Sequence, residues 1–308
     1  MSDKYVRIYG NTDIGKKRAN NEDAFLAQKI WDDDHWLTVV IDGVGGHEGG
    51  EVAAEIAQAT ILKYLQEFPD GERLSLLKEA VTQANNSIFE ARGQRKGCAE
   101  MSCVLTACLF ELPEMRLNMV HVGDTRLYCH TGKSLQKLSH DHSFIGYYEE
   151  NGTISEEEAM NHPQRNIVNR VVGDAIHSVD DEKFIEAQTF PLIPDSAYLL
   201  CSDGLYDMLT SAEIASVLDK EISTEDKVNG LIDFANQKGG KDNITVVLLQ
   251  VEDDKTAVTD TVVIDDIPET TRQLDVSSKR YKIIQIIILI LVCLIASVAT
   301  AWLLHLIL

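Results

Sequence analysis

Residues 39–51 read VVIDGVGGHEGGE: a short apolar, β-branched run stops at Asp42, and five glycines follow within the next eight residues. Such a run between turn residues is typical of a buried strand, which we expect to cover 36–41. The last glycine is followed by Glu51 instead of Lys and then Ser or Thr, which excludes a Walker phosphate loop. The glycine spacing also fails the G-x-G-x-x-G fingerprint of dinucleotide-binding folds. The pattern therefore predicts an acid at a strand end, beside a backbone that can bend sharply.

The regions around this stretch show both helical and strand-like patterns. Apolar residues recur at helical spacing in some segments, whereas others are short apolar or β-branched runs. The expected helices cover 51–66, 74–88, 155–162, 211–220 and 228–239. The expected strands cover 36–41, 103–110, 116–122, 126–130, 197–201 and 243–251. Because the strands follow one another in hairpin-like succession, the order favours an α+β fold built on antiparallel sheet over a doubly wound one.

Charge and cysteine content narrow the class of protein. The 308 residues carry a formal charge of -21, which argues against nucleic-acid binding because that function needs basic patches. The six cysteines form no C-x-x-C pair, which disfavours a zinc knuckle or a redox dithiol and suggests buried thiols in a reducing compartment. The first residues contain no apolar run, so we expect no cleaved signal peptide.

The C-terminal part differs in composition from the rest. No residue from 283 to 308 is charged, and such a run exceeds the roughly 20 residues that span a bilayer. A buried core helix is the less favoured interpretation, because the run is too long and too uniform. Lys279, Arg280 and Lys282 stand just before it, and basic flanks prefer the cytoplasmic side of a membrane. We therefore expect a folded cytoplasmic domain over 4–252, a flexible acidic tether over 253–282 and a transmembrane helix over 283–305.

Several acids stand at the mouths of the expected strands, namely Asp42, Asp124, Asp203 and Asp242. A single such aspartate is usually a turn residue, but four in one chain are harder to explain in this way. Glu22 and Asp23 form a further acidic pair, close to Arg18. Oxygen ligands without His or Cys suit Mg²⁺ or Mn²⁺. Two such ions about 4 Å apart can activate a water for in-line attack on phosphorus, and an arginine fork matches a phosphate group.

Six segments, taken in order, resemble the metal-dependent Ser/Thr protein phosphatase family (protein phosphatase type 2C, PPM), in its bacterial branch. They are RANNEDAF at 18–25, VVIDGVGGHEGGE at 39–51, VGDTRLY at 122–128, DHSFI at 141–145, CSDGLYDML at 201–209 and GGKDNITVVLL at 239–249. Each segment alone is common, but the ordered set is highly specific. The resemblance spans roughly residues 4–252.

This resemblance implies a four-layer α-β-β-α sandwich, in which two antiparallel sheets are flanked by helices, with a centre of two Mn²⁺ or Mg²⁺ ions at one edge. It also implies a role for each matching residue. Asp42 is expected to bridge both ions and the Gly43 carbonyl to bind one of them, while Asp203 and Asp242 bind the other. Glu22 and Asp23 are expected to hold water beside the metals, Arg18 to hold the phosphate, and Asp124 to complete a third, weaker metal site. The segment 149–173 resembles a flap that affects substrate choice.

The chain also departs from the family pattern. Eukaryotic members carry a suggested general acid, a histidine, where this chain has Val44, and the nearby His47 is displaced by three positions. A catalytic role and an ordinary loop position both remain open for His47. The segment AEMSCVLTA at 99–107 replaces a Gly-Thr-Thr-type segment, so we expect altered packing there. Arg126 is expected to brace its loop by an ion pair, and His121 to be a hydrogen-bonded core residue.

Together these features predict an enzyme that hydrolyses phosphoserine and phosphothreonine in proteins through a metal-activated water, on the cytoplasmic face of a membrane. Its expected partners are phosphoprotein substrates, with a membrane Ser/Thr kinase as a further candidate. Two other classes stay open: a pseudophosphatase that binds without turnover, and a membrane scaffold that only docks partners. The complete set of acids favours the enzyme.

Overall fold

The computed structural model describes residues 5–45, 49–92, 94 and 98–252. The tether predicted over 253–282 and the transmembrane helix predicted over 283–305 lie outside these residues, as does His47. Within the described ranges, no helix has the length and apolar character needed to cross a membrane.

Ten strands form two antiparallel sheets of five. The β10 sheet has the order β1 (Tyr5–Asp13), β10 (Ile244–Glu252), β9 (Ser196–Cys201), β6 (Arg126–Thr131) and β7 (Ser134–Lys137). The β3 sheet has the order β2 (Asp23–Lys29), β3 (His35–Val44), β4 (Ser102–Glu111), β5 (Arg116–Val122) and β8 (Glu186–Pro191). The first and last strands of the described domain are therefore neighbours in one sheet.

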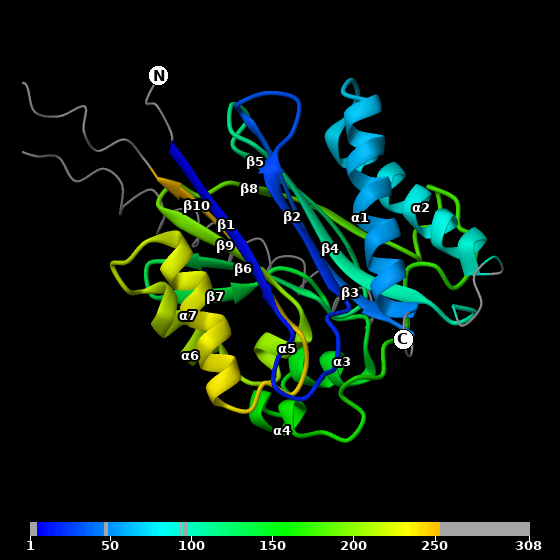
Figure 1. Cartoon of the computed structure of the whole chain (residues 1–308). Coiled ribbons are helices and arrows are strands. Elements are labelled where there is room, and N and C mark those ends of the chain that lie inside the picture. Colours follow the sequence, from blue (N-terminus) through cyan, green and yellow to red (C-terminus); the bar gives the residue numbers. More distant parts are fainter. Residues whose placement is uncertain (1–4, 46–48, 93, 95–97, 253–308) are drawn as a thin grey trace, which may run out of the picture. The chain divides into compact units, whose positions relative to one another are not determined.

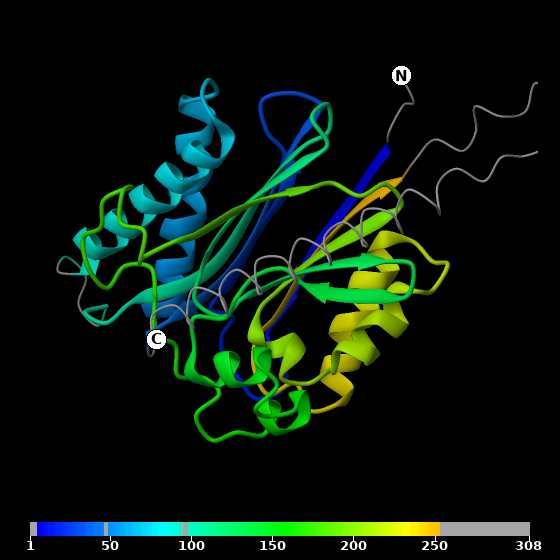
Figure 2. The same ribbon diagram turned by 180° about the vertical axis from the view of Figure 1, so that it is seen from behind.

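Helices cover the outer faces of both sheets (Figures 1 and 2). On the β3 sheet lie α1 (Gly49–Glu67) and α2 (Arg73–Arg92). On the β10 sheet lie α6 (Ser211–Leu218) and α7 (Thr224–Gln237). Three short helices, α3 (Phe144–Glu150), α4 (Glu156–Met160) and α5 (Asp203–Tyr206), gather at one end of the sandwich (Figure 1). The predicted arrangement of two antiparallel sheets flanked by helices is confirmed.

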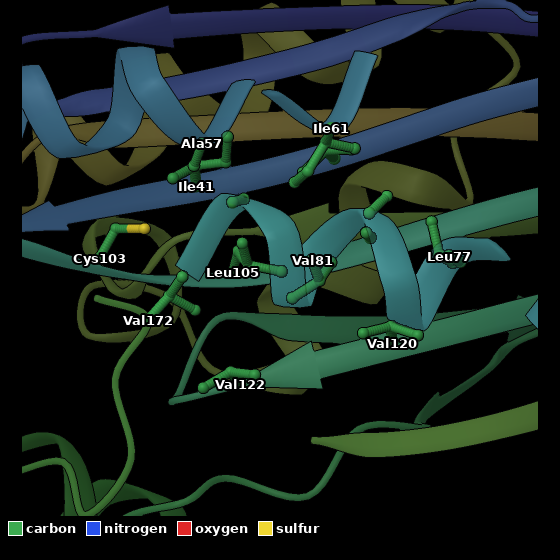
Figure 3. Packing of buried hydrophobic residues seen from close by; sticks show 14 of the residues in the cluster. Ile41, Ala57, Ile61, Leu77, Val81, Cys103, Leu105, Val120, Val122 and Val172 are labelled. Carbon is green, nitrogen blue, oxygen red and sulfur yellow. The ribbon is translucent and has the colours of Figure 1, made fainter. Parts of the chain in front are cut away.

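The apolar run that ends at Asp42 is continuous because β3 is buried on both faces. Val40 belongs to the buried layer between the two sheets, which also contains Phe110 and Leu200. Val39 and Ile41 point to the other face and pack under the helices. Figure 3 shows this outer layer, in which Ala57 and Ile61 of α1 and Leu77 and Val81 of α2 meet Ile41, Leu105 and Val120 of the sheet. Since strand residues alternate between faces, a half-exposed strand would have shown alternating polarity instead.

The sequence patterns missed the more polar elements. The sequence analysis predicted none of the following elements, because their apolar residues are few or irregularly spaced: the strands β1, β2, β7 and β8, and the helices α3 and α5. Helix α7 begins at Thr224 rather than at 228, since the hydroxyl of Ser223 accepts a hydrogen bond from the Asp226 N–H and caps its first turn. The capping box expected from Ser155 and Glu158 is present at the start of α4.

Candidate active site

The predicted site residues meet at one end of the sandwich, in a cavity of about 460 Å³. Seven of the eight line this cavity: Arg18, Glu22, Asp42, Gly43, Asp124, Asp203 and Asp242. The eighth, Asp23, is absent from the cavity wall and lies beside Asp42 in the strand pair β2–β3. Acids from distant parts of the sequence are therefore brought to one place.

Backbone pairing explains how the N-terminal acids reach the cavity. Asp23 pairs with Asp42 in the β2–β3 register, and the Gly43 N–H donates to the Glu22 carbonyl at 3.1 Å. Gly43 must be glycine, because a Cβ there would lie 2.2 Å from the Gly50 carbonyl oxygen. The glycines of the 39–51 stretch thus let the start of α1 pack directly against the strand that carries Asp42.

Asp203 and Asp242 come from two neighbouring strands of the other sheet. Asp203 opens α5 directly after β9, and Asp242 stands just before β10. The next residue, Asn243, was missed by the sequence analysis, although it lies within a quoted motif. Its amide donates to the carbonyls of Ile14 and Asn20 at 3.0 Å, and its side-chain oxygen accepts from the Glu22 N–H at 2.8 Å. Asn243 therefore fixes the N-terminal segment that carries Arg18 and Glu22 against the β10 sheet.

Arg18 is the one arginine among the described residues that line the cavity. Its guanidinium donates to an Asp242 carboxylate oxygen at 2.5 Å, and this hydrogen bond raises the pKa of Arg18. The side chain is 46% exposed, so the group stands at the solvent side of the acids. A guanidinium in this position can reach an anion that enters from solvent.

Asp23 lies beneath the cavity wall and is hydrogen-bonded on one side only. The hydroxyls of Ser202 and Thr245 both donate to its Oδ2 atom, at 2.7 and 2.6 Å. Burial raises the pKa of Asp23 to about 6, despite these two donors. The second oxygen, Oδ1, receives neither of them.

The acids that line the cavity repel one another. Burial and neighbouring carboxylates raise the pKa of Asp42 and of Asp203 well above the ordinary value, and burial raises that of Asp124 to about 7. Among the hydrogen bonds of the described residues, none is donated by a side chain to the carboxylate of any of these three. Buried carboxylates without donors are costly unless a cation compensates them. An all-oxygen set of this kind fits Mg²⁺ or Mn²⁺.

Asp124 is presented by a tight turn after β5. Gly123 has φ of +107°, and a Cβ there would lie 2.1 Å from the side chain of Val104. The Gly123 N–H donates to His142, while its carbonyl accepts from the His142 N–H at 2.6 Å and from His121 at 2.9 Å. His121 also contacts the Thr106 hydroxyl at 2.9 Å and is fully buried, so the expected hydrogen-bonded core histidine is confirmed.

A cluster of charged side chains around the buried Arg126 and Asp141 adjoins this turn. We call it the Arg126 cluster, and it consists of Arg126, Lys137, Asp141, Glu149 and Glu150. Arg126 donates to Asp141 at 2.7 Å and to Glu149 at 2.6 Å, and Lys137 lies 3.0 Å from Asp141 and 2.6 Å from Glu150. The expected ion pair of Arg126 is confirmed, and through Glu149 it also attaches α3.

Part of the segment 149–173 reaches the cavity. Asn166 and Val168 line it, and Arg165 pairs with Asp207, one turn after Asp203 in the chain. The sequence analysis named this segment but none of these residues, because nothing in an irregular loop shows which side chains point inward. Val44 also lines the cavity and is 40% exposed, so the position of the eukaryotic histidine is apolar and open to solvent here.

The fold and the acidic cavity are those of a known class of enzyme. The family model for protein phosphatase 2C matches residues 13–241, and the chain belongs to that family. The predicted enzyme class, a protein serine/threonine phosphatase, is thereby confirmed.

Individual relatives are similar over nearly their whole length. The chain is 33% identical over 255 residues to a putative protein phosphatase 2C-type from Streptococcus pyogenes, covering 80% of this chain and 98% of the relative. The structure of the serine/threonine phosphatase of S. agalactiae superimposes with a TM-score of 0.71 at 31% identity, covering 80% of this chain and 99% of that one. The catalytic domain of the phosphatase PstP, in complex with two manganese ions, superimposes with a TM-score of 0.69 at 30% identity, covering 81% and 100%.

Proposed function

We propose that this chain removes phosphate from phosphoserine and phosphothreonine in proteins, at the acidic cavity and with two Mn²⁺ or Mg²⁺ ions bound there. The observation that carries the proposal is that one cavity holds the buried carboxylate of Asp124 and the partly buried carboxylates of Asp42 and Asp203, to which no described side chain donates a hydrogen bond. Such a group is stable when cations enter it. The similarity to a phosphatase domain holding two manganese ions supports the same choice of metal.

The proposed metal ligands follow the resemblance to the family, and the gathering of these acids in one cavity supports them. Asp42 would contact both ions and the Gly43 carbonyl one of them, while Asp203 and Asp242 hold the second. Asp124, across the cavity, would complete a third and weaker site. Glu22, in the cavity wall, and the Oδ1 atom of Asp23, which Ser202 and Thr245 leave vacant, would hold water beside the ions.

The chemistry is mainly electrostatic positioning. When bound, the ions lower the pKa of water and neutralise the charge of the phosphate. Arg18 would donate to phosphate oxygens from the solvent side, since its guanidinium is half exposed and already poised beside Asp242. Because Val44 cannot donate a proton, the proton that the departing serine or threonine oxygen needs would come from solvent.

The full chain should hydrolyse a phosphothreonine peptide only when Mn²⁺ or Mg²⁺ is added. Asp203→Ala should abolish this activity, because it removes a proposed metal ligand. The Asp203 carboxylate receives no hydrogen bond from a described side chain, so it is free to bind a metal ion. Asp33→Ala is the matched control, since Asp33 is exposed and pairs only with Lys29. A wild-type chain without hydrolysis at saturating Mn²⁺ would instead support a pseudophosphatase or a scaffold.

We also propose that the uncharged run from 283 to 305 anchors the enzyme in a membrane, with 253–282 as a tether and the catalytic domain in the cytoplasm. The support is the length and composition of the run and the three basic residues before it. Tethering would raise the local concentration of membrane-bound substrates, and a membrane Ser/Thr kinase is the proposed partner. Deleting 279–308 should release the protein from the membrane fraction; retention would contradict the anchor.

A further inference from the structure

We propose that Tyr206 is a positioning residue that holds Asp124 at a fixed place relative to Asp203. The inference rests on the proposed function, in which both aspartates bind metal. Tyr206 and Asp203 stand at opposite ends of the single-turn helix α5. The phenol of Tyr206 donates to the backbone carbonyl of Asp124 at 2.9 Å. One short helix thus carries one acid of the site and holds the backbone of another.

The hydrogen bond matters because Asp124 has little other support. Its carboxylate receives no hydrogen bond from a side chain of the described residues, so the position of this group follows from its backbone. His142 and His121 fix the preceding peptide, at Gly123. Tyr206 is the side chain that fixes the carbonyl on the other side of the Asp124 Cα atom.

Tyr206 is itself held from behind. The guanidinium of Arg126 lies over its ring, 3.8 Å from the ring centre, and the tyrosine is only 8% exposed. Arg126 is in turn fixed by Asp141 and by Glu149 of α3. A buried ring stacked on an anchored arginine has few rotamers available, so its hydroxyl stays aimed at Asp124. Arg126 does not line the cavity itself, but it supports the cavity by holding Tyr206 in place.

Tyr206→Phe distinguishes the role of the hydroxyl from that of the ring, because phenylalanine keeps the stacking on Arg126 and loses the hydrogen bond to Asp124. With the bond lost, we expect the weakest Mn²⁺ site to bind about threefold to tenfold less tightly, the range that one net hydrogen bond commonly covers. The tighter sites and kcat at saturating Mn²⁺ should stay close to wild type, since Asp42, Asp203 and Asp242 keep their positions.

Tyr128→Phe provides a matched control. Tyr128 is also buried, and its hydroxyl accepts a hydrogen bond from the same Arg126 at 3.2 Å, but within the described part of the chain it makes no hydrogen bond to Asp124. Both variants lose one buried phenol oxygen next to Arg126. Any general weakening of the Arg126 cluster should therefore appear in both, whereas weakened metal binding should appear in Tyr206→Phe alone.

The test is calorimetric titration of the metal-free full chain with Mn²⁺, together with the Mn²⁺ dependence of p-nitrophenyl phosphate hydrolysis and the thermal midpoint of each variant. Weaker binding at one site in Tyr206→Phe, with Tyr128→Phe like wild type, supports the inference. Equal isotherms for the two variants overturn it while leaving the proposed function intact. A wild-type chain that binds no Mn²⁺ overturns both.

Discussion

Two neighbouring groups of charged side chains in this molecule, each partly buried, behave in opposite ways. In the cavity, burial and neighbouring acids raise the pKa of Asp42 and Asp203 well above the ordinary value. In the Arg126 cluster, burial alone would raise the pKa of Asp141, but Arg126 and Lys137 outweigh it and hold that pKa below the ordinary value. Asp124 of the cavity and Asp141 of the cluster are both buried, yet the pKa of Asp124 is raised to about 7, so burial does not explain the difference.

The difference lies in where the compensating positive charge comes from. The Arg126 cluster takes it from its own side chains and can be complete as soon as the domain folds. Among the described residues, Arg18 is the one arginine in the cavity wall, and Arg126 and Arg165 act on Asp124 and Asp203 from behind it. These cations do not bring the pKa of Asp42, Asp124 or Asp203 back to the ordinary value, so further positive charge is expected from outside the chain. A buried carboxylate with protein donors therefore indicates a structural role, and one without them indicates a binding site.

The largest effect on the free energy of unfolding is expected from removing Arg126 from the Arg126 cluster. Arg126→Met removes the cation that buried Asp141 shares with the largely buried Glu149, and only Lys137 of the cluster then remains beside Asp141. Removing one partner of a buried ion pair typically costs about 3–5 kcal/mol. Urea denaturation of the metal-free protein should report a loss of this size. An unchanged unfolding free energy would mean that the cluster is not held together by Arg126.

The next largest effect is a change of about 2–4 kcal/mol in the free energy of unfolding with pH, which is expected from Asp124 in the cavity. Without metal, burial raises the pKa of folded Asp124 to about 7, whereas in the unfolded chain its pKa is near the ordinary value of 3.8. Between these values the folded state binds more protons, so the stability of wild type relative to Asp124→Asn should fall as pH rises from about 4 to about 7. Saturating Mn²⁺ should weaken this slope, since metal binds the deprotonated acid. Parallel stability curves for the two proteins would contradict the raised pKa.

The smallest effect, about 1 kcal/mol, is expected from Lys137→Met. Asp141 keeps both hydrogen bonds from Arg126 in this variant, and Glu150 is partly exposed to solvent, which replaces the lost ammonium. Thermal denaturation of Lys137→Met and of Arg126→Met, measured together, would show how much each of the two cations contributes to stability. Equal losses would show that Asp141 needs both of them.

The sequence reveals some parts of this site better than others, for physical reasons. Asp203 and Asp242 flank largely apolar strands, so their place at strand ends could be predicted before any pairing was known. Asp42 ends an apolar run, but β3 continues past it to Val44, because Asp42 and Gly43 still pair with β4. Asn243 forms hydrogen bonds with backbone groups of residues more than two hundred positions away, and no local sequence pattern predicts such a contact.

Long-range pairing accounts for the remaining gaps. Tyr206 appeared only as part of a motif, because its partner Asp124 comes from another strand. Strands β1 and β8 carry too few regularly spaced apolar residues to stand out, and tertiary pairing rather than local preference makes them strands. The four layers were predicted through the resemblance to a family; the strand patterns alone indicated only antiparallel sheet.

The pairing of β1 with β10 has a consequence for biosynthesis. Synthesis proceeds from the N-terminus, and β10 must insert between β1 and β9 after both have been made. Asp242 and Asn243, which complete the site and fix Arg18 and Glu22, emerge only just before that last strand. A nascent chain therefore lacks Asp242, and the contacts that fix Arg18 and Glu22, until β10 is about to be made. Under the proposed function, partly made copies would not act on phosphoproteins.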